Sequence, residues 1–427
     1  MKKVLIVAHL FHASPRIPGL SKYLPEFGWQ PIILTPPLGE DPDSRLGPPN
    51  NLRDRNRVIE TYGYNAGEDM GLRIKKQLNL TSRELYGYVR PFLRFLYRHY
   101  LEITHYPDKE RNWKLFAVNA GKEVLQNEHV EAMISSSSPV TAHLIANELK
   151  DKYDIPWVAD FRDLWTQNHS YPYSRLRKMF ERRLEVKTLS RADALVTTSQ
   201  PWAEKLKMLH KKEAHTITNG FDPDMVSDGK VDLTSSFTIT YTGQVYTRKQ
   251  NPSRLLSALK DLIIERALDP KDIRVRFYGP LSEQLEKETV EYGLSGIVKQ
   301  YGIIPRQDSF ARQRESQLLL LLNWDDSRER GVYTGKVFEY LAAQRPILAT
   351  GGFGNDVVEA LLEETNSGVY CSTVEDIKRA IRDSYREYRS KGRVTYNGDM
   401  EKVNKYSYRE MARKFVRILT ALMKGGD

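Results

Sequence analysis

The sequence has very little cysteine, with Cys371 the single one among 427 residues. One thiol can form neither an internal disulfide nor a multi-thiolate metal site. Long hydrophobic runs are also missing, since LLLLLN at 318–323 is far too short to cross a bilayer. The apolar run in MKKVLIVAH ends at His9 without a small-residue cleavage pattern, so it predicts a buried strand rather than a signal peptide. These absences predict a cytoplasmic protein.

Low-complexity segments and repeats of 20 to 50 residues are absent as well, which excludes solenoids and disordered chains. A chain of this length exceeds what one hydrophobic core usually serves, so two domains are expected. The formal net charge of +10 favours an anionic partner. Nucleic acid, an acidic lipid surface and a phosphorylated substrate all fit that charge.

Short β-branched runs alternate with helical patterns along most of the chain, which predicts parallel sheets covered on both faces. The pattern restarts after a turn-rich segment at 222–235, so we expect an α/β protein with two doubly wound, Rossmann-like domains facing a central cleft. Their expected ranges are 1–225 and 226–400, and a helix in 401–427 falls outside the pattern and could pack back toward the first domain. The expected strands are 4–8, 31–35, 132–138, 156–161, 194–199, 215–220, 237–243, 275–279, 298–302, 318–323 and 346–351.

The first strand ends at a loop that carries His9, His12, Arg16 and Gly19, before a helix around LSKYLPEFGW. The two histidines are three positions apart, but a third metal ligand with suitable spacing is missing. We therefore favour a loop that contacts an acceptor or a phosphate.

Two Asp-Pro-Asp triplets, at 41–43 and 222–224, offer carboxylates that could hold Mg²⁺ between substrate phosphates. Proline after aspartate is also an ordinary turn signal, and both triplets lie in turn-rich connectors. The turn interpretation is favoured, and no metal site is predicted.

The stretch GVYTGKVFEYLAAQ, 331–344, resembles a phosphate loop only superficially, because its glycines are too close and Val337 follows the lysine. Thr334 is a candidate helix cap, Gly335 allows a ligand to approach the backbone, and Lys336 adds charge at the positive helix end. Phe338, Leu341 and Ala342 should face the core. Glu339 falls on the face next to the anion, where it could bind two neighbouring hydroxyls or simply be solvated.

Two further groups of charged residues follow predicted strands. Gly243 lies in a turn ahead of Arg248 and Lys249, which could clamp a diphosphate or be solvated cations. Asp160, Arg162 and Asp163 stand at the exit of an apolar strand, where doubly wound sheets place their chemistry, although an internal Arg–carboxylate pair is the alternative.

Residues 72–114 are rich in arginine, lysine, tyrosine and phenylalanine, as in YVRPFLRFLYRHYLEITHYP. Such a basic and aromatic stretch suits peripheral contact with an anionic membrane, but a solvated helix or RNA also fits. We favour contact with a membrane or an acceptor.

Over essentially its whole length the chain resembles the nucleotide-sugar glycosyltransferases of the GT-B type, family 4. The landmarks that carry this resemblance are ISSSSPVTAHLIA, IPWVADFRDLWT, ADALVTTSQPWAEKL, ITNGFDPD, YTGQVYTRKQNP, FYGP and TGKVFEYLAAQRPILATGG.

The resemblance implies a retaining enzyme that needs no cofactor and usually no metal. Its C-terminal domain would hold a nucleoside-diphosphate sugar, and its N-terminal domain a glycan or lipid-linked acceptor. Lys249 and Arg248 would contact the diphosphate, Thr334 and Gly335 its oxygens, and Glu339 the ribose. Polysaccharide or glycolipid synthesis on the inner face of the cell membrane would follow, with no nucleic acid partner.

The chain departs from the family pattern at two positions. Gly331 stands where the family commonly has a sugar-contacting glutamate, so Tyr333, Glu329 or the backbone would have to supply that contact. Arg162 stands near where many members have a histidine, and we expect Asp163 or Asp160 to assist the acceptor or orient the sugar. The rival functions are a nucleotide-sugar 2-epimerase or hydrolase on the same fold, and a non-catalytic protein that binds RNA or membranes.

Overall fold

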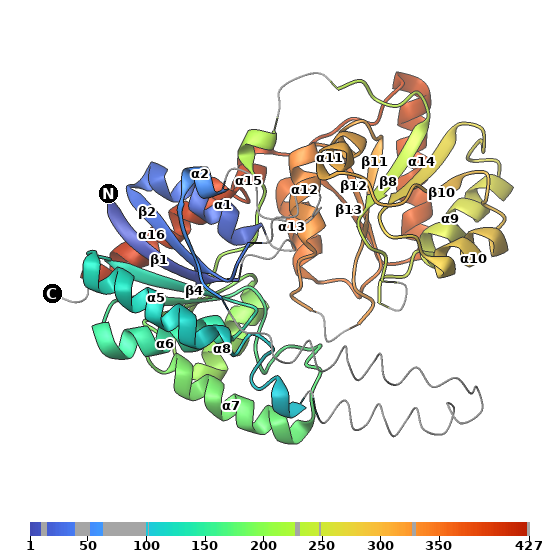
Figure 1. Cartoon of the computed structure of the whole chain (residues 1–427). Coiled ribbons are helices and arrows are strands. Elements are labelled where there is room, and N and C mark those ends of the chain that lie inside the picture. Colours follow the sequence, from blue (N-terminus) through green and yellow to red (C-terminus); the bar gives the residue numbers. More distant parts are fainter. Residues whose placement is uncertain are drawn as a thin grey trace. The chain divides into compact units, whose positions relative to one another are not determined.

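The computed structural model describes residues 1–9, 15–38, 52–62, 100, 102–226, 231–246, 249–326 and 330–424. The chain divides into two compact units, Met1–Ile217 with Ala412–Asp427, and Thr218–Met411. Each unit contains one parallel sheet with helices on its faces (Figure 1). Two doubly wound α/β units are therefore confirmed.

The sheet of the first unit has seven strands in the order β3-β2-β1-β4-β5-β6-β7. The strand pairings of this sheet are parallel, for example Ile6 with Ile33 in β2 and Ile134 in β4. The strands are β1 (Lys2–Ala8), β2 (Trp29–Thr35), β3 (Arg57–Glu60), β4 (Ala132–Ser137), β5 (Trp157–Phe161), β6 (Ala194–Thr197) and β7 (Ala214–Thr216). The helices are α1 (Arg16–Tyr23), η1 (Leu24–Phe27), α2 (Leu52–Arg55), α5 (Trp113–Asn127), α6 (Thr141–Tyr153), α7 (Arg175–Leu189) and α8 (Gln200–His210).

The sheet of the second unit has six strands in the order β10-β9-β8-β11-β12-β13. The strands are β8 (Phe237–Thr242), β9 (Ile273–Tyr278), β10 (Val298–Gln300), β11 (Leu318–Leu322), β12 (Ile347–Thr350) and β13 (Gly368–Cys371). The helices are η2 (Pro223–Met225), α9 (Ser253–Ile264), α10 (Glu283–Glu291), α11 (Arg306–Arg314), α12 (Gly335–Ala343), α13 (Val357–Thr365), α14 (Val374–Lys391), α15 (Met400–Asn404) and α16 (Tyr408–Lys424). Helix α16 begins in the second unit, but from Ala412 onward it belongs to the first.

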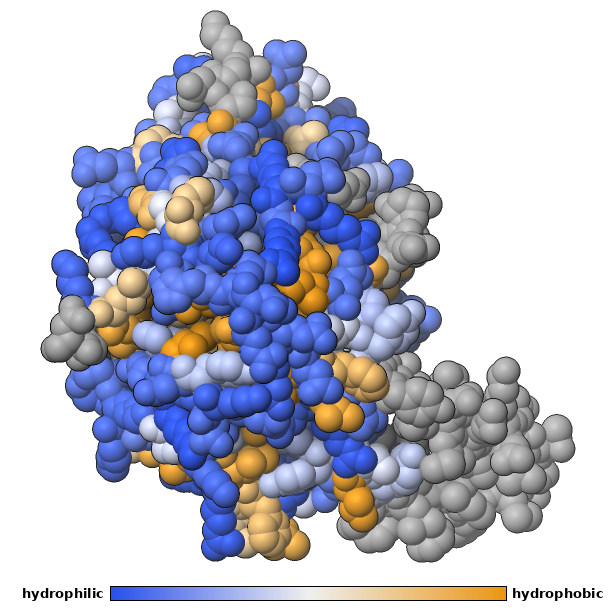
Figure 2. Space-filling view, turned by 60° about the vertical axis from the view of Figure 1, so that its left-hand side comes forward, coloured by the Kyte–Doolittle hydropathy of each residue, from blue (hydrophilic) through white to orange (hydrophobic). Residues whose placement is uncertain are grey.

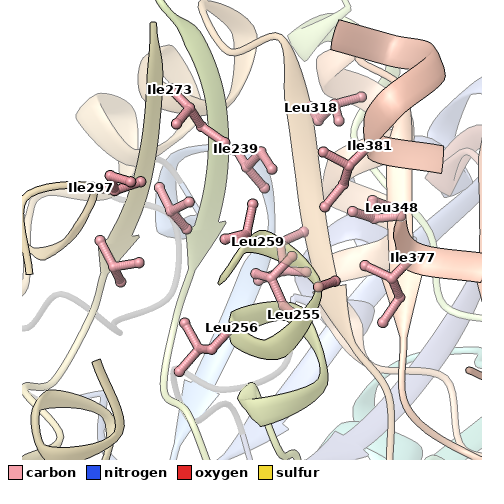
Figure 3. Close-up of a cluster of buried hydrophobic side chains, with 14 of the residues drawn as sticks. Ile239, Leu255, Leu256, Leu259, Ile273, Ile297, Leu318, Leu348, Ile377 and Ile381 are labelled. Carbon is pink, nitrogen blue, oxygen red and sulfur yellow. The ribbon is translucent and has the colours of Figure 1, made fainter. Parts of the chain in front are cut away.

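Strand β11 shows why the sheet of the second unit needs helices on both faces. Successive side chains of a strand point to opposite faces. Leu318, Leu320 and Leu322 pack in one core cluster, while Leu319 and Leu321 pack in another. Figure 3 shows the first cluster, where leucines of α9 meet isoleucines of α14 over the strands. Apolar side chains on both faces make this strand a continuous leucine run.

The order of strands fixes where the chemistry of each unit can gather. In doubly wound sheets, ligands bind beyond the carboxyl ends of the strands where the strand order reverses. In the second unit that point lies between β8 and β11, so the segments after Thr242 and Leu322 meet there. In the first unit it lies between β1 and β4, so the segments after Ala8 and Ser137 meet there.

Candidate functional site

The start of α12 is the first part of the candidate site in the second unit. Thr334 is the cap residue, with φ −71° and ψ 134°, and its side chain is only 7% exposed. Its hydroxyl is buried and makes no hydrogen bond within the described part of the chain. Gly335 follows, and a Cβ built there would meet nothing within 4 Å. The helix therefore begins with open space, an unused hydroxyl and the positive end of its dipole.

Lys336 brings a full charge to the same place. Its ammonium lies 5.1 Å from the centre of the Tyr241 ring, and its aliphatic chain passes beside Gly243. Burial lowers the pKa of Lys336 to about 8, and the nearby Glu339 carboxylate opposes that shift. Because burial disfavours the charged form of Lys336, a bound anion would stabilise that form.

Glu339 is half-buried on the turn of α12 that follows Gly335. Among the described residues, its carboxylate makes no hydrogen bond and no ion pair within 4 Å. On the opposite side of the helix, Phe338, Leu341 and Ala342 are buried in the core, as the spacing predicts. The carboxylate therefore keeps both oxygens available as acceptors.

The segments after β8 and β11 meet around Trp324. The Lys249 ammonium lies 5.3 Å from the centre of the Trp324 ring, and the Asp325 N–H donates to the Lys249 carbonyl at 2.8 Å. The Trp324 indole N–H is buried and makes no hydrogen bond to any described residue. Sequence analysis missed Trp324, although its place directly after a buried leucine run would have signalled it. Arg248 lies outside the described residues.

Gly331 stands where the resemblance implies a sugar-contacting glutamate, and its backbone conformation favours glycine. Gly331 has φ +89°, in the left-handed region where a glycine is favoured. Its N–H donates to Asp356 Oδ1 at 3.2 Å, and the same carboxylate caps α13 at Val357 and accepts from Asn323. Position 331 thus has a backbone role. Of the proposed replacements, Tyr333 packs against Phe338 and Glu329 lies outside the described residues.

Asp160 of the first unit is buried with a partner that sequence analysis did not pair with it. The Arg16 guanidinium donates to both carboxylate oxygens, with Nη2 2.8 Å from Oδ1 and Nε 3.0 Å from Oδ2. The Ser136 hydroxyl donates to Oδ2 at 2.8 Å. The Arg16 and Asp160 side chains are 1% and 0% exposed. In this structure Asp160 therefore joins β5 to α1 rather than facing solvent.

Arg162 and Asp163 lie just beyond β5. Arg162 Nη2 donates to the Ser138 carbonyl at 3.1 Å, and its Nε lies 3.5 Å from Asp163 Oδ2. Burial lowers the pKa of the Arg162 guanidinium, and the two nearby aspartates oppose this. The Asp163 side chain is 48% exposed, so it is the carboxylate of this group that a ligand can reach.

The predicted loop after β1 is shorter than expected. Helix α1 begins at Arg16, so Arg16 and Gly19 belong to the helix, where the Gly19 N–H donates to the Pro15 carbonyl. His9 directly follows β1, with Nε2 4.0 Å from Glu110 Oε1. His12 lies outside the described residues.

The Asp-Pro-Asp triplet at 222–224 forms a turn, because the Asp222 side chain accepts a hydrogen bond from the Asp224 N–H at the start of η2. The triplet at 41–43 and most of the basic stretch at 72–114 lie outside the described residues. Among the residues that are described, no group of three or more His, Cys, Asp or Glu side chains could hold a metal ion. None of the described helices combines the length and apolarity needed to span a membrane.

Solved structures with the same architecture include several sugar-transferring enzymes. Sucrose-phosphate synthase from Thermosynechococcus elongatus is 13% identical, with TM-score 0.62 and 100% of each chain covered. HepE from Anabaena in complex with UDP is 12% identical, with TM-score 0.64 and 99% and 100% covered. Trehalose 6-phosphate synthase from Burkholderia multivorans is 12% identical, with TM-score 0.58 and 100% of each chain covered. At these identities the likeness shows the fold.

Comparison by sequence adds a match to a family model over part of the chain. Residues 19–225 match the model of Glycosyltransferase Family 4, and curated proteins give no match. The match and the fold agree with the resemblance carried by the sequence landmarks, and together they support a glycosyltransferase of the GT-B type. The chain therefore has the GT-B fold throughout, and its residues 19–225 carry the sequence pattern of Glycosyltransferase Family 4.

Proposed function

We propose that the protein transfers a sugar, with retention of the anomeric configuration, from a nucleoside-diphosphate sugar to a hydroxyl of a glycan or lipid-linked acceptor. One observation carries the donor part of this proposal. At the start of α12, the buried and unused Thr334 hydroxyl stands in the same helical turn as a lysine with a depressed pKa. A diphosphate supplies the acceptor oxygens and the negative charge that these groups lack.

The helix start is suited to a phosphate by its backbone as well. The first N–H groups of a helix have no partner inside it, and the helix dipole adds partial positive charge there. Gly335 leaves room for phosphate oxygens to approach these groups. We assign the diphosphate to this helix start, with Lys336 and Lys249 as cations and Arg248 as a further proposed contact.

Glu339 is assigned to the ribose. Its carboxylate can accept hydrogen bonds from two neighbouring hydroxyls, and no described residue donates a hydrogen bond to it. HepE, which shares the fold, is solved with UDP and with UDP-glucose. We therefore propose a uridine diphosphate sugar as the first donor to test.

The chemistry follows from these assignments. As the sugar's anomeric carbon separates from the diphosphate, negative charge grows on the leaving oxygens and positive charge on the sugar. Donors aimed at the leaving oxygens stabilise this transition state, typically by about 3 kcal/mol for one well-placed group. The acceptor hydroxyl then attacks on the face that the diphosphate leaves, which retains the configuration, and its proton passes to the departing phosphate.

We assign the acceptor to the first unit. Its switch point between β1 and β4 is the counterpart of the donor site in the second unit. His9 directly follows β1, Arg162 and Asp163 follow β5 beside β4, and Asp163 is partly exposed. Asp160 takes a positioning role, because Arg16 and Ser136 already occupy its oxygens.

Calorimetry with UDP, other nucleoside diphosphates and inorganic diphosphate tests the donor site first. Turnover of UDP-glucose with and without polyprenyl-phosphate-linked saccharides then tests transfer. Appearance of a glycosylated acceptor supports the proposal. Rapid epimerisation or hydrolysis without any acceptor would replace transfer with the rival enzyme class, and absent nucleotide binding together with tight RNA binding would overturn the enzyme assignment.

A further inference from the structure

Helix α7 of the first unit is fixed by the polar side chains on its inner face. Ser174 caps the helix at the Arg177 N–H, and Arg177 forms a buried ion pair with Glu181, with Nε 2.5 Å from Oε1. The Trp165 indole N–H donates to Glu181 at 2.9 Å. Further along the helix, Glu185 accepts from the Thr166 N–H. The two acids of α7 are thus turned inward, and the helix presents a defined outer face.

The outer face of α7 carries large apolar side chains that are exposed in the described part of the chain. Their exposed fractions are 64% for Leu176, 44% for Met179, 48% for Phe180 and 39% for Val186. Met179 and Phe180 follow Leu176 by three and four positions, so each lies beside Leu176 on the helix surface. Figure 2 shows one face of the molecule, where apolar areas lie among hydrophilic residues. Four exposed apolar side chains on one helix indicate an interaction surface.

Cations accompany these apolar side chains. The basic residues outside the buried face of α7 are Arg175, Lys178, Arg182, Arg183 and Lys187. Within the described part of the chain, none of these five forms an ion pair with a carboxylate. Because Glu181 and Glu185 are 1% and 0% exposed, the outer face of the helix carries positive charge alone.

We propose that the outer face of α7 is a binding surface for anionic lipid bilayers. Apolar side chains interspersed with cations that form no ion pair with a described carboxylate are the pattern of a helix that lies in the membrane interface. The apolar groups enter the acyl boundary while the cations meet lipid phosphates, which accounts for both kinds of exposed residue. An acidic protein would account for the cations but offers no equal cover for the apolar side chains. This surface is separate from the proposed donor site and does not depend on it.

Flotation of the full-length protein with vesicles tests the surface directly. Vesicles of phosphatidylcholine alone are compared with vesicles containing about one third phosphatidylglycerol, at low and physiological salt. We expect binding to the anionic vesicles only. The double variant Arg182→Gln/Arg183→Gln should lower the partition coefficient about 30-fold at low salt, at roughly fivefold per cation. Phe180→Ser should lower it about tenfold, and this loss should persist at high salt.

Matched controls separate the surface from general charge and hydrophobicity. Arg379→Gln/Arg386→Gln removes two exposed cations from α14, and Ile264→Ser removes an apolar side chain that is 68% exposed on α9. These variants should bind vesicles like the unchanged protein. Absence of binding to anionic vesicles, equal binding to neutral vesicles, or losses in the α14 and α9 variants as large as in the α7 variants would each overturn the proposal. An unchanged unfolding midpoint shows that each variant is folded.

Discussion

The side chain of Lys336 packs directly against the backbone of Gly243. The lysine side chain passes so close to the glycine that a Cβ at position 243 would lie 2.4 Å from Lys336 Cε. Gly243 also has φ +108°, in the left-handed region. The turn after β8 therefore stays free of a side chain, and the ammonium from α12 can occupy the proposed phosphate site.

Replacement of this lysine should weaken binding of nucleoside diphosphates strongly. Lys336→Met keeps the aliphatic bulk but removes the charge, and we expect about 30-fold weaker binding of UDP, or roughly 2 kcal/mol, from the loss of a charge-assisted hydrogen bond. Calorimetry measures the change. The exposed Lys271→Met is the control, and an equal affinity in both variants would remove Lys336 from the site.

The pH dependence of binding should carry the signature of the same lysine. With its pKa lowered to about 8, Lys336 is charged below that pH and neutral above it in the free protein. A bound diphosphate favours the charged form, so affinity should fall above pH 8 by up to about tenfold per pH unit. Calorimetry at pH 8.5 in buffers of different ionisation enthalpy should detect proton uptake on binding. The Lys336→Met variant should show neither effect, and a pH-dependent affinity in that variant would assign the effect to another group.

Glu339 can be tested by separating the ribose from the diphosphate. Glu339→Ala should weaken UDP binding about tenfold, because hydrogen bonds to a charged group contribute roughly 1.5 kcal/mol or more. Binding of inorganic diphosphate should not weaken, since that ligand has no hydroxyls to contact. Equal losses for both ligands would show that Glu339 acts on the helix start rather than on the ribose.

The buried pair of Arg16 and Asp160 should control the stability of the first unit. Removing one partner leaves an uncompensated buried charge, so Arg16→Met should lower the free energy of unfolding by about 3 to 5 kcal/mol. Five of the six tryptophans lie in this unit, at positions 29, 113, 157, 165 and 202, so urea unfolding followed by fluorescence mainly reports on it. The double variant Arg16→Met/Asp160→Leu should recover much of the loss. If the double variant is no more stable than Arg16→Met, uncompensated charge is not the cause.

Placing a glutamate at position 331, as the family resemblance implies, should destabilise the second unit. Gly331→Glu forces a side chain into the left-handed region, at a cost of about 1 to 2 kcal/mol in the free energy of unfolding, and disturbs the hydrogen bond to Asp356. Gly335→Ala is the matched control, because its φ is not positive and a Cβ there meets nothing. Thermal unfolding compares the two variants. An unchanged stability of Gly331→Glu would contradict the backbone role assigned to position 331.

Most of the fold can be predicted from the sequence, because most strands contain a continuous run of buried residues. Each expected strand appears within a few residues of its predicted ends. The two that were missed, β3 and β13, are edge strands with the partly exposed sequences RVIE and GVYC. An edge strand has a neighbour on one side only and does not need a continuous apolar run, so periodicity gives little signal for it.

The candidate site was predicted less completely than the fold. Local spacing was enough to place Thr334, Gly335 and Glu339 at one helix start. The pairing of Arg16 with Asp160 was not predictable in this way, because the two residues are 144 positions apart and meet only through the sheet order. From the sequence, Asp160 is instead grouped with its chain neighbours Arg162 and Asp163.

The division of α16 between the units has a consequence for synthesis of the chain. Phe415 and Leu419 are fully buried in the first unit, and the Phe415 ring lies 5.4 Å from the Arg16 guanidinium carbon. The ribosome therefore makes the whole second unit before it delivers the last helix of the first. Until then the nascent first unit lacks two side chains of its core, so that core is completed only after the second unit has been synthesised.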